Sequence, residues 1–366
     1  MSLELEEHLV ARANVAMIPL TANFELTPVC NLNCDMCFIR MSRKGCELHG
    51  GLRSVEEWLD IARQFQQLGT LFILLTGGEP MLYSGFKELY LALRKMGFIL
   101  TLNTNGTLID ESICQMFASA KPRRVNVTLY GGNDTTYQRL CHHPGGFDKC
   151  VRALRLLRQY DIDTKLNVSV VKKNLDDYEE IMAIAKELDI PVVVNSYMFP
   201  ALRSLCHGCR DVDTERIDPL TAAEIQEQYV RYKKESEGED YHRHARQSTF
   251  SIEHLTPNPE GIGLDCRAGR SSVWINWQHT MTPCVLMEHP AVSLQQTTVK
   301  QAWNEIIQKG QQLPKHEECC NCKLRKLCQV CYAAASHEKK VRGNLYYLCD
   351  MAHHEYYILQ QEAAKE

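Results

Sequence analysis

Short apolar runs alternate with amphipathic stretches through the first half of the chain. Residues 71–75 are wholly apolar, which is typical of a parallel strand buried on both faces. The stretch 54–68 has apolar residues at helical spacing, begins with a capping box of Ser54 and Glu57, and is followed by Gly69. Strands that alternate with helices in this way predict a parallel sheet with right-handed crossovers.

Six strand-and-helix units are found here, fewer than the eight that close a complete barrel. We therefore predict an α/β fold built on a partial, open (β/α)6 barrel. The predicted strands are 22–27, 71–75, 98–102, 124–129, 165–171 and 191–195. The predicted helices are 54–68, 84–96, 110–119, 147–159 and 176–188, with a charged helical stretch over 219–245. The expected domains are an N-terminal extension (1–20), the barrel (21–218), a helical linker (219–260) and a cysteine-rich domain (261–366).

The loops that follow the predicted strands are rich in polar and glycine residues. In barrels of this type, chemistry gathers on such loops. Gly, Asn and Pro alone would simply indicate turns. Several of these loops on one rim, beside a group of cysteines, favour a site. They are Cys30–Cys37, Thr76–Pro80, Asn103–Gly106, Tyr130–Asn133 and Ser196–Pro200.

The first of these loops places Cys30, Cys34 and Cys37 at the spacing Cys-x3-Cys-x2-Cys. A [4Fe–4S] cluster has four irons and usually takes four thiolates. Three ligands leave one iron open to hold a substrate. The alternative is a zinc site that takes its fourth ligand from elsewhere in the chain. The loop favours the iron–sulfur interpretation.

Composition narrows the class of protein. Of 366 residues, 45% are hydrophobic and 23% are charged, as in ordinary globular proteins. A net charge of −4 gives no reason to expect nucleic-acid binding, and no apolar run reaches the length of a membrane span. The acidic N-terminus lacks the basic region of a signal peptide. We expect a cytoplasmic protein, where 17 cysteines are more typical of metal ligands than of disulfides.

Cysteines return in the last third of the chain, where Cys266 precedes a predicted strand pair over 272–276 and 280–282 that ends at Cys284. Read alone, Cys319-x2-Cys322 with Cys328-x2-Cys331 also suits a compact zinc knuckle. The cysteines of this region are Cys266, Cys284, Cys319, Cys320, Cys322, Cys328, Cys331 and Cys349.

The cysteine triad and the Gly77-Gly78-Glu79-Pro80 loop resemble those of radical S-adenosylmethionine enzymes. The resemblance implies that Cys30, Cys34 and Cys37 hold a [4Fe–4S] cluster, whose open iron chelates S-adenosylmethionine. It places Gly77, Gly78, Glu79 and Pro80 at the methionine amine, and Asn105 and Thr128 at the adenosine pocket. Met36 is a departure, because the family commonly has an aromatic residue there.

The later cysteines resemble a SPASM domain, which in that family binds two auxiliary [4Fe–4S] clusters. The resemblance implies a small C-terminal cysteine-rich iron–sulfur domain. It assigns Cys266, Cys284 and Cys331 to the first auxiliary cluster, and Cys319, Cys322, Cys328 and Cys349 to the second. Cys320 is an alternative to Cys319. The first cluster lacks an obvious fourth ligand: either that iron is open to a substrate group, or Cys206 or Cys209 closes it.

Three departures from the SPASM pattern stand out. His279 occupies a position where a turn glycine is usual, Cys328 and Cys331 are one residue closer than usual, and no cysteine lies just upstream of Cys266. Interleaved ligands cross-link distant segments, so we expect this domain to be unstable without iron.

No catalytic residue can be assigned from the sequence, and four weak candidates stand out. Cys206 and Cys209 form a CxxC beside a basic residue, which lowers thiol pKa in some proteins, although a surface loop with incidental thiols is an equal alternative. Tyr197 follows the sixth predicted strand, and Asp265 precedes Cys266. Other residues are expected to be structural: Cys114 and Cys150 as buried packing residues, and His142-His143 as a solvated turn.

The resemblance implies an oxidoreductase that cleaves S-adenosylmethionine and abstracts hydrogen from a peptide or protein. We expect a peptide maturase that forms a crosslink, thioether or epimer, supplied with electrons by a flavodoxin or ferredoxin. One alternative is a sulfatase-maturase-like dehydrogenase that forms formylglycine. Another, from a different class, is an iron–sulfur or zinc scaffold without radical chemistry, which the Gly77–Pro80 loop disfavours. No nucleic acid or membrane partner is expected.

Overall fold

The computed structural model describes residues 3–200, 212–253, 263–328 and 331–365. One nine-stranded sheet organises the molecule, in the order β6-β5-β4-β3-β2-β1-β7-β8-β9. Strands β1 to β6 are parallel to one another. Since β6 and β9 stand at the two ends of the sheet, it does not close, and the predicted open, parallel barrel is confirmed.

The six barrel strands lie close to the predicted ranges. Each carries apolar residues that are fully buried, such as Phe24, Ile73 and Leu100. These strands are β1 (Thr21–Thr27), β2 (Phe72–Gly77), β3 (Ile99–Thr104), β4 (Arg124–Thr128), β5 (Thr164–Ser169) and β6 (Val192–Asn195).

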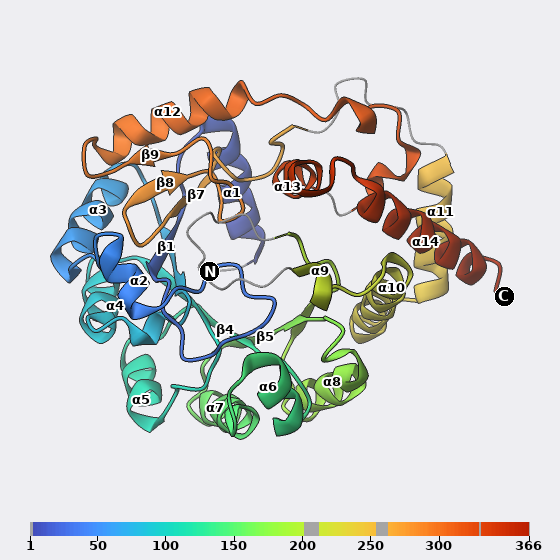
Figure 1. Cartoon of the computed structure of the whole chain (residues 1–366), viewed down its shortest axis with the longest axis horizontal. Helices are drawn as coiled ribbons and strands as arrows, with labels where there is room; N and C mark the ends of the chain where they lie inside the picture. Colours follow the sequence, from blue (N-terminus) through green and yellow to red (C-terminus); the bar gives the residue numbers. More distant parts are fainter. Residues whose placement is uncertain (1–2, 201–211, 254–262, 329–330, 366) are drawn as a thin grey trace.

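Helices between the strands form an arc around the sheet (Figure 1). The first of them, α3, begins at the predicted capping box: Ser54 and Glu57 each bond to the other's backbone N–H. Gly69 follows with a φ of +89°, a left-handed conformation that favours glycine. The helices that match predicted ones are α3 (Val55–Gln67), α4 (Phe86–Lys95), α5 (Glu111–Ser119), α7 (Gly146–Gln159) and α8 (Tyr178–Glu187). The short 3-10 helices η1 (Pro80–Leu82) and η2 (Leu175–Asp177) precede α4 and α8.

The C-terminal strand pair extends the barrel sheet. Strand β7 (Ser272–Ile275) pairs in parallel with β1, and β8 (Thr280–Thr282) and β9 (Val292–Ser293) follow in antiparallel pairing. The sequence predicts the first two of these strands but not their place beside β1. Pairing between residues about 250 positions apart leaves no local signal in the sequence.

Several helices lie outside the predicted set. The N-terminal extension forms α1, whose Ala13 packs against Leu20 and Phe72. Trp303 of α12 donates a hydrogen bond from Nε1 to the backbone oxygen of Met17, at 2.8 Å. The additional helices are α1 (Leu3–Ala16), α2 (Arg43–Leu48), α6 (Asp134–Cys141), α9 (Val212–Glu215), α12 (Val299–Gln311), α13 (Tyr332–Arg342) and α14 (Tyr346–Ala363), with 3-10 helices η3 (Glu317–Cys319) and η4 (Lys323–Lys326).

The region expected to be a helical linker contains α10 (Pro219–Ser236) and α11 (Tyr241–Glu253). Both pack against α14, and Figure 1 shows the three helices side by side. The domain boundaries themselves stay a prediction. In the described parts of the chain, no helix has the length and apolar character to span a bilayer, and none of the cysteines is in a disulfide.

Candidate active site

The cluster loop, residues 30–37, lies at the carboxyl end of β1. Its turns are held locally, because Leu32 N–H donates to Cys30 Sγ at 3.4 Å and Cys37 N–H donates to the Cys34 oxygen at 3.1 Å. Burial, followed by the charges of Glu79, Cys34 and Cys37, raises the pKa of Cys30 to about 12. The structure therefore brings the three predicted cysteines to one buried space.

The donor set at this loop suits a cationic iron–sulfur cluster. Burial also raises the pKa of Cys37, with Cys34 adding to the effect, so the thiols require a nearby cation to ionise. A single zinc ion would draw its sulfur ligands to about 2.3 Å from one point. Over the described residues, no three His, Cys, Asp or Glu side chains converge in this way.

The end of α6 holds the cluster loop by its backbone. Asn33 N–H donates to the Cys141 oxygen at 2.9 Å, and Asp35 N–H donates to the Leu140 oxygen at 3.0 Å. The Cys141 thiol also forms a hydrogen bond with the Cys34 thiol. The sequence leaves Cys141 isolated because the fold, rather than the spacing, brings it to the loop.

The side chain of Asp35 is a second anchor of the loop. Its carboxylate is buried and lies 2.8 Å from His142 Nε2 and 2.5 Å from Lys173 Nζ. Lys173 also contacts Glu215 at 2.8 Å. Burial alone would raise the pKa of Asp35, but the bonds from Lys173 and His142 hold it below its usual value. His142 is therefore more than the solvated turn that the sequence predicts, since it contacts the cluster loop.

Gly77 and Gly78 allow the end of β2 to lie directly against β1 and the cluster loop. A Cβ at Gly77 would stand 2.3 Å from the Thr27 oxygen, and one at Gly78 would stand 2.5 Å from the Val29 oxygen. Gly77 also has a φ of +149°. In this close contact Gly78 N–H donates to the Thr27 oxygen at 2.7 Å. This close packing explains why glycine occupies both positions, independently of any ligand.

Glu79 joins the loops that follow β2 and β3. Its side chain is fully buried and accepts hydrogen bonds from Thr104 Oγ1, from Asn105 N–H at 2.9 Å and from Met81 N–H at 3.2 Å. Burial raises the pKa of Glu79 to about 7, against the effect of these hydrogen bonds. Pro80 begins η1 directly after it. Glu79 therefore positions the loops around Cys30.

Asn105 and Thr128, predicted at the adenosine pocket, lie at the ends of neighbouring strands. Asn105 Nδ2 donates to Asn31 Oδ1 at 3.0 Å and contacts Cys30 Sγ at 3.6 Å. Thr128 ends β4, and its backbone oxygen faces the Cys150 thiol at 3.8 Å. Cys150 and Cys114 are fully buried, as expected of packing residues.

The cysteines of the C-terminal region form two groups in space. In the first auxiliary group, Cys266, Cys284 and Cys331 act on one another: burial, with the charges of Cys331 and Cys266, raises the pKa of Cys284 to about 12. Cys206 and Cys209, the candidates for a fourth ligand, lie outside the described residues.

The second auxiliary group, Cys319, Cys322, Cys328 and Cys349, lines one small cavity of about 60 Å³. Burial and the charges of Glu318, Cys349 and Cys322 raise the pKa of Cys319 to about 11. Cys320 does not line this cavity. The two groups contain the cysteines that the SPASM resemblance names, and Cys319 rather than Cys320 lines the cavity. Their role as cluster ligands stays a prediction.

Of the remaining catalytic candidates, Tyr197 is hydrogen-bonded within the protein and Asp265 lies on the surface. Tyr197 donates its hydroxyl hydrogen to Glu338 Oε1 at 2.8 Å, and Arg216 lies 5.0 Å from its ring centre. It therefore belongs to a buried contact between the barrel and α13. Asp265 is exposed, and its Oδ2 accepts from Gly263 N–H at 3.2 Å.

His279 occupies the turn between β7 and β8 with a φ of +59°, which explains why glycine suits this position. Its ring packs edge-on against Trp58, with centroids 4.4 Å apart. Burial lowers the pKa of His279 to about 4, which keeps the ring neutral. The His279 side chain therefore makes a packing contact that glycine at this position could not make.

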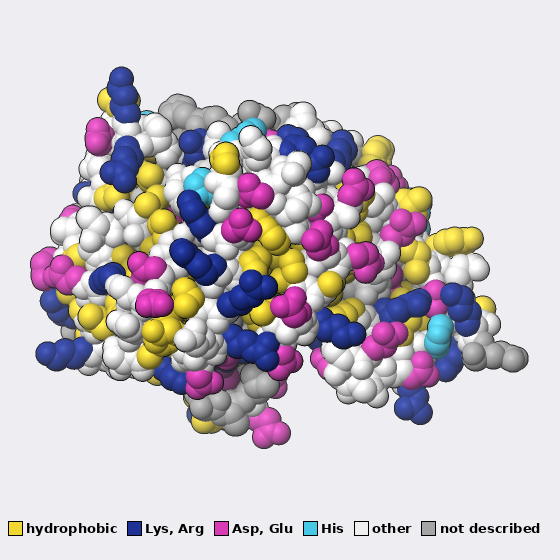
Figure 2. Space-filling model, turned by 90° about the horizontal axis from the view of Figure 1, so that it is seen from below, with side chains coloured by type: hydrophobic (Ala, Val, Ile, Leu, Met, Phe, Trp, Pro, Cys, Tyr) yellow, Lys and Arg dark blue, Asp and Glu magenta, His cyan; other side chains and the backbone are white. Residues whose placement is uncertain are grey.

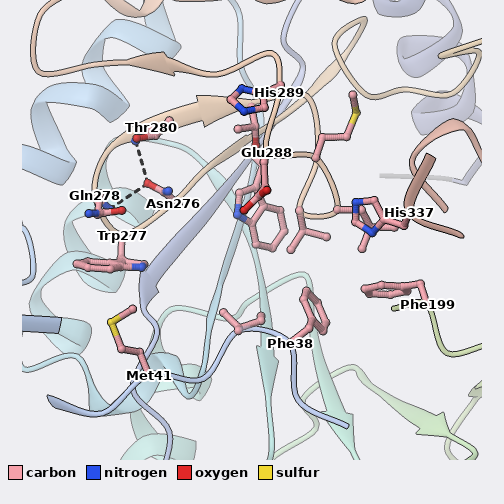
Figure 3. Close-up of a pocket in the computed structure, with 16 residues that line it drawn as sticks. Phe38, Met41, Phe199, Asn276, Trp277, Gln278, Thr280, Glu288, His289 and His337 are labelled. Carbon is pink, nitrogen blue, oxygen red and sulfur yellow. Dashed lines mark hydrogen bonds between the residues drawn. The ribbon is translucent and has the colours of Figure 1, made fainter. Parts of the chain in front are cut away.

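An aromatic pocket of about 290 Å³ is lined by Phe38, which follows Cys37 in the chain, and by Val285, which follows Cys284. Phe38, the residue after Cys37, lies on one side with Phe199, whereas Glu288 and His289 lie on the other (Figure 3). The rings of Phe38 and Phe199 meet edge-on at 4.9 Å. The sequence did not single out this pocket, because its walls come from four separate segments. The full lining is Phe38, Ile39, Met41, Phe199, Trp274, Asn276, Trp277, Gln278, Thr280, Thr282, Val285, Leu286, Met287, Glu288, His289 and His337.

Comparison with known proteins identifies the barrel. Residues 24–185 match the Radical SAM superfamily. The chain is 23% identical over 331 residues to an AdoMet-dependent heme synthase of Methanosarcina barkeri, covering 87% of this chain and 92% of that protein. It is 28% identical over 172 residues to the PqqA peptide cyclase of Gluconobacter oxydans, covering 46% of this chain and 47% of that protein.

Among solved structures, the fold is similar to that of SuiB from Streptococcus suis. The form bound to S-adenosylmethionine gives a TM-score of 0.62 at 17% identity, covering 93% of this chain and 79% of SuiB. The form bound to its precursor peptide SuiA gives 0.63 at 18% identity, with the same coverage. The likeness extends beyond the barrel to the C-terminal region.

Proposed function

Because residues 24–185 form a radical SAM domain, we propose that this enzyme acts on a residue of a peptide substrate. Hydrogen abstraction from that residue would lead to a post-translational modification such as a crosslink, thioether or epimer. One observation carries the proposal: the aromatic pocket opens directly beside the cluster loop, since Phe38 follows Cys37 and lines the cavity. The similarity to the PqqA peptide cyclase and to SuiB bound to SuiA supports a peptide as the substrate.

In this proposal, Cys30, Cys34 and Cys37 hold the [4Fe–4S] cluster that the family implies. When bound and reduced, the cluster would supply one electron to break the sulfonium C–S bond of S-adenosylmethionine, which gives methionine and a deoxyadenosyl radical. Gly77 and Gly78 let the end of β2 pack directly against the backbone of β1 and the cluster loop, and Glu79 and Asn105 fix the neighbouring loops. We expect S-adenosylmethionine to bind at this edge. Water must be excluded from such a radical, and the ring pair of Phe38 and Phe199 covers this side of the loop.

The two C-terminal groups would each hold an auxiliary cluster. The aromatic pocket is lined by Val285 to His289, directly after Cys284. A substrate residue there would lie between the first cluster and the first auxiliary group. That position suits removal of a second electron, or binding of a substrate group to an open iron.

A flavodoxin or ferredoxin of acidic surface is the proposed electron donor. Helix α7 exposes four basic side chains at intervals of three residues, Lys149, Arg152, Arg155 and Arg158. Seen from below, Lys and Arg side chains gather near the middle of the face (Figure 2), on the side where α7 lies in Figure 1. The preceding helix, α6, contacts the cluster loop through Leu140 and Cys141. Charge complementarity there would bring the donor close to the first cluster.

A second candidate is a heme-synthase-like reaction on a tetrapyrrole, favoured by the extended similarity to the Methanosarcina enzyme. A formylglycine-forming dehydrogenase is a further alternative, for which the exposed Asp265 would have to act as the base. The scaffold alternative predicts no cleavage of S-adenosylmethionine at all.

Anaerobic purification with iron counting and product analysis tests the proposal. We expect about twelve irons per chain if three four-iron clusters form, and deoxyadenosine after reduction with S-adenosylmethionine. Replacing Cys30, Cys34 and Cys37 with Ala should abolish deoxyadenosine and leave about eight irons. The control is Cys114→Ala, a buried cysteine outside all three groups, which should keep all its irons. Zinc as the main metal, or cleavage in the triple variant, would contradict the proposal.

A further inference from the structure

The aromatic pocket has a composition that can select among peptide side chains. Its walls include four aromatic rings, Phe38, Phe199, Trp274 and Trp277, together with the sulfur-bearing Met41 and Met287. Trp274 directs its indole N–H away to Glu25, whose carboxylate accepts it at 2.8 Å. Ring edges and methionine sulfur make favourable contacts with an aromatic guest.

The polar side chains of the pocket are largely engaged within the protein. Asn276 Oδ1 accepts from the N–H groups of Gln278 and Thr280, at 3.0 and 2.9 Å (Figure 3). Gln278 Nε2 donates to the His49 oxygen at 3.1 Å, and Thr282 Oγ1 donates to the Cys284 oxygen at 3.1 Å. These bonds engage the side chains of Asn276, Gln278 and Thr282, whereas Nδ1 of His337 is buried without a hydrogen-bond partner among the described residues. Packing against the rings is therefore the main basis of the recognition that we consider here.

The charged groups around the pocket disfavour a carboxylate. None of the lining residues is Lys or Arg, and the one acid among them is Glu288. Two cations among the described residues are engaged by other groups: Lys340 pairs loosely with Glu288 at 3.8 Å, and Arg40 acts on Cys37 without lining the cavity. Burial lowers the pKa of His337, so its ring supplies no positive charge at neutral pH. A guest carboxylate would therefore lose its hydration without gaining a cation.

We propose that the aromatic pocket binds an aromatic side chain of the peptide substrate and excludes acidic side chains. The inference rests on the proposed function, since it assumes that the substrate is a peptide. At about 290 Å³ the cavity is at the small end of ligand pockets, which suits one side chain better than a tetrapyrrole with several carboxylates.

Equilibrium dialysis of the anaerobically reconstituted enzyme with S-adenosylmethionine tests the proposal. The probes are capped pentapeptides of glycine with a central Phe, Leu or Glu, and a porphyrin tetracarboxylate. We expect the Phe peptide to bind about tenfold more tightly than the Leu peptide, and the Glu peptide to show no binding. Equal binding of the Phe and Glu peptides, or tighter binding of the porphyrin, would overturn the inference.

Matched variants locate the binding. Phe38→Ala and Phe199→Ala should each weaken the Phe peptide about tenfold, whereas Phe250→Ala, at a Phe that is 63% exposed, should not. Glu288→Lys should allow the Glu peptide to bind, and Glu237→Lys, at a surface acid that also pairs loosely with lysine, should not. An unchanged Phe-peptide affinity in both pocket variants would contradict the assignment. Deoxyadenosine formation is measured separately, so failure of the proposed function is distinguished from failure of this inference.

Discussion

The cluster loop extends from a strand of the parallel sheet, whereas the second auxiliary group lies on 3-10 helices, turns and the start of α14. Around the cluster loop, the neighbouring strands bury Phe24, Leu75 and Leu102 completely. In the C-terminal region, Cys322 and Cys349 are exposed, and the adjoining apolar cluster of Ala335, Leu345 and Leu348 is small.

This difference teaches where stability comes from in each region. Burial of apolar side chains stabilises the barrel whether or not iron is bound. The C-terminal cysteines lie among three small apolar clusters rather than beside one large core. In our proposal their metal therefore supplies much of the folding free energy. The barrel should therefore fold without iron, whereas folding of the C-terminal region should depend on iron.

Removal of iron should have the largest effect and tests this contrast directly. After anaerobic chelation, we expect amide protection to fall to the level of unfolded chain over η3, η4 and the start of α14. Strands β2 to β5 should retain their protection because their core is apolar. Hydrogen exchange with mass spectrometry measures both regions in one sample. Equal loss of protection in both would mean that the barrel also depends on iron.

Gly78→Ala should have the next largest effect and is confined to the barrel. The added Cβ would meet the Val29 and Pro28 oxygens at 2.5 and 2.7 Å, so the cluster loop must shift. We expect deoxyadenosine formation to fall about 100-fold, since an error of about 1 Å at a reacting centre has this scale of effect. Gly310→Ala is the control, because its Cβ would meet only Leu264 at 3.6 Å. Normal activity in Gly78→Ala would show that the loop tolerates displacement.

The pH dependence of stability probes the C-terminal helices. Burial, with the charge of Glu227, raises the pKa of Glu355 in α14 to about 8. The folded state then holds a proton that the unfolded state releases above its own pKa of about 4.3. Stability should therefore fall as pH rises from about 4.3 to about 8, by on the order of 5 kcal/mol.

Glu355→Gln should flatten this slope, because the amide stays neutral at every pH. Glu305→Gln, an exposed acid paired with Lys309 at 2.5 Å, is the control. Thermal denaturation of each variant from pH 5 to 8 provides the measurement. Identical slopes in the wild type and in Glu355→Gln would show that Glu227, Tyr241 or another group of the α10–α14 contact dominates.

The same two regions differ in how far the sequence predicts them. Barrel strands and helices follow from local apolar periodicity and from caps such as Ser54, which the structure reproduces. The open parallel sheet could be predicted for this reason. In the C-terminal region the periodicity is weak in α13 and α14, and neither is predicted. Helix α12 is also outside the prediction, although its buried residues have regular helical spacing and it begins with a capping box. Pairing of β7 with β1 depends on long-range contacts that no local pattern encodes.

Candidate site residues divide along a similar line. Spacing alone indicates Cys30, Cys34 and Cys37, because these ligands share one loop. The aromatic pocket, Cys141 and the Asp35–Lys173 pair join segments far apart in sequence, and only the fold brings them together. Motif reasoning therefore finds the candidate metal ligands but misses the groups that position them.

Asp35→Asn should have the smallest effect. It measures how much the charge of Asp35 contributes to the stability of the cluster loop. The amide keeps the size of the side chain but loses the ionic attraction to Lys173 and His142, which lie 2.5 and 2.8 Å from the carboxylate. We expect a loss of about 1–2 kcal/mol in stability, and a shift in the reduction potential of the first cluster because a nearby negative charge is removed. The control is Asp163→Asn, which removes an exposed pair with Arg124 at 2.8 Å and should cost at most about 0.5 kcal/mol. Denaturation and anaerobic redox titration measure the two effects. A change in stability without a shift in potential would assign Asp35 a purely structural role, and the cluster loop would then resemble the rest of the barrel, which is held by packing.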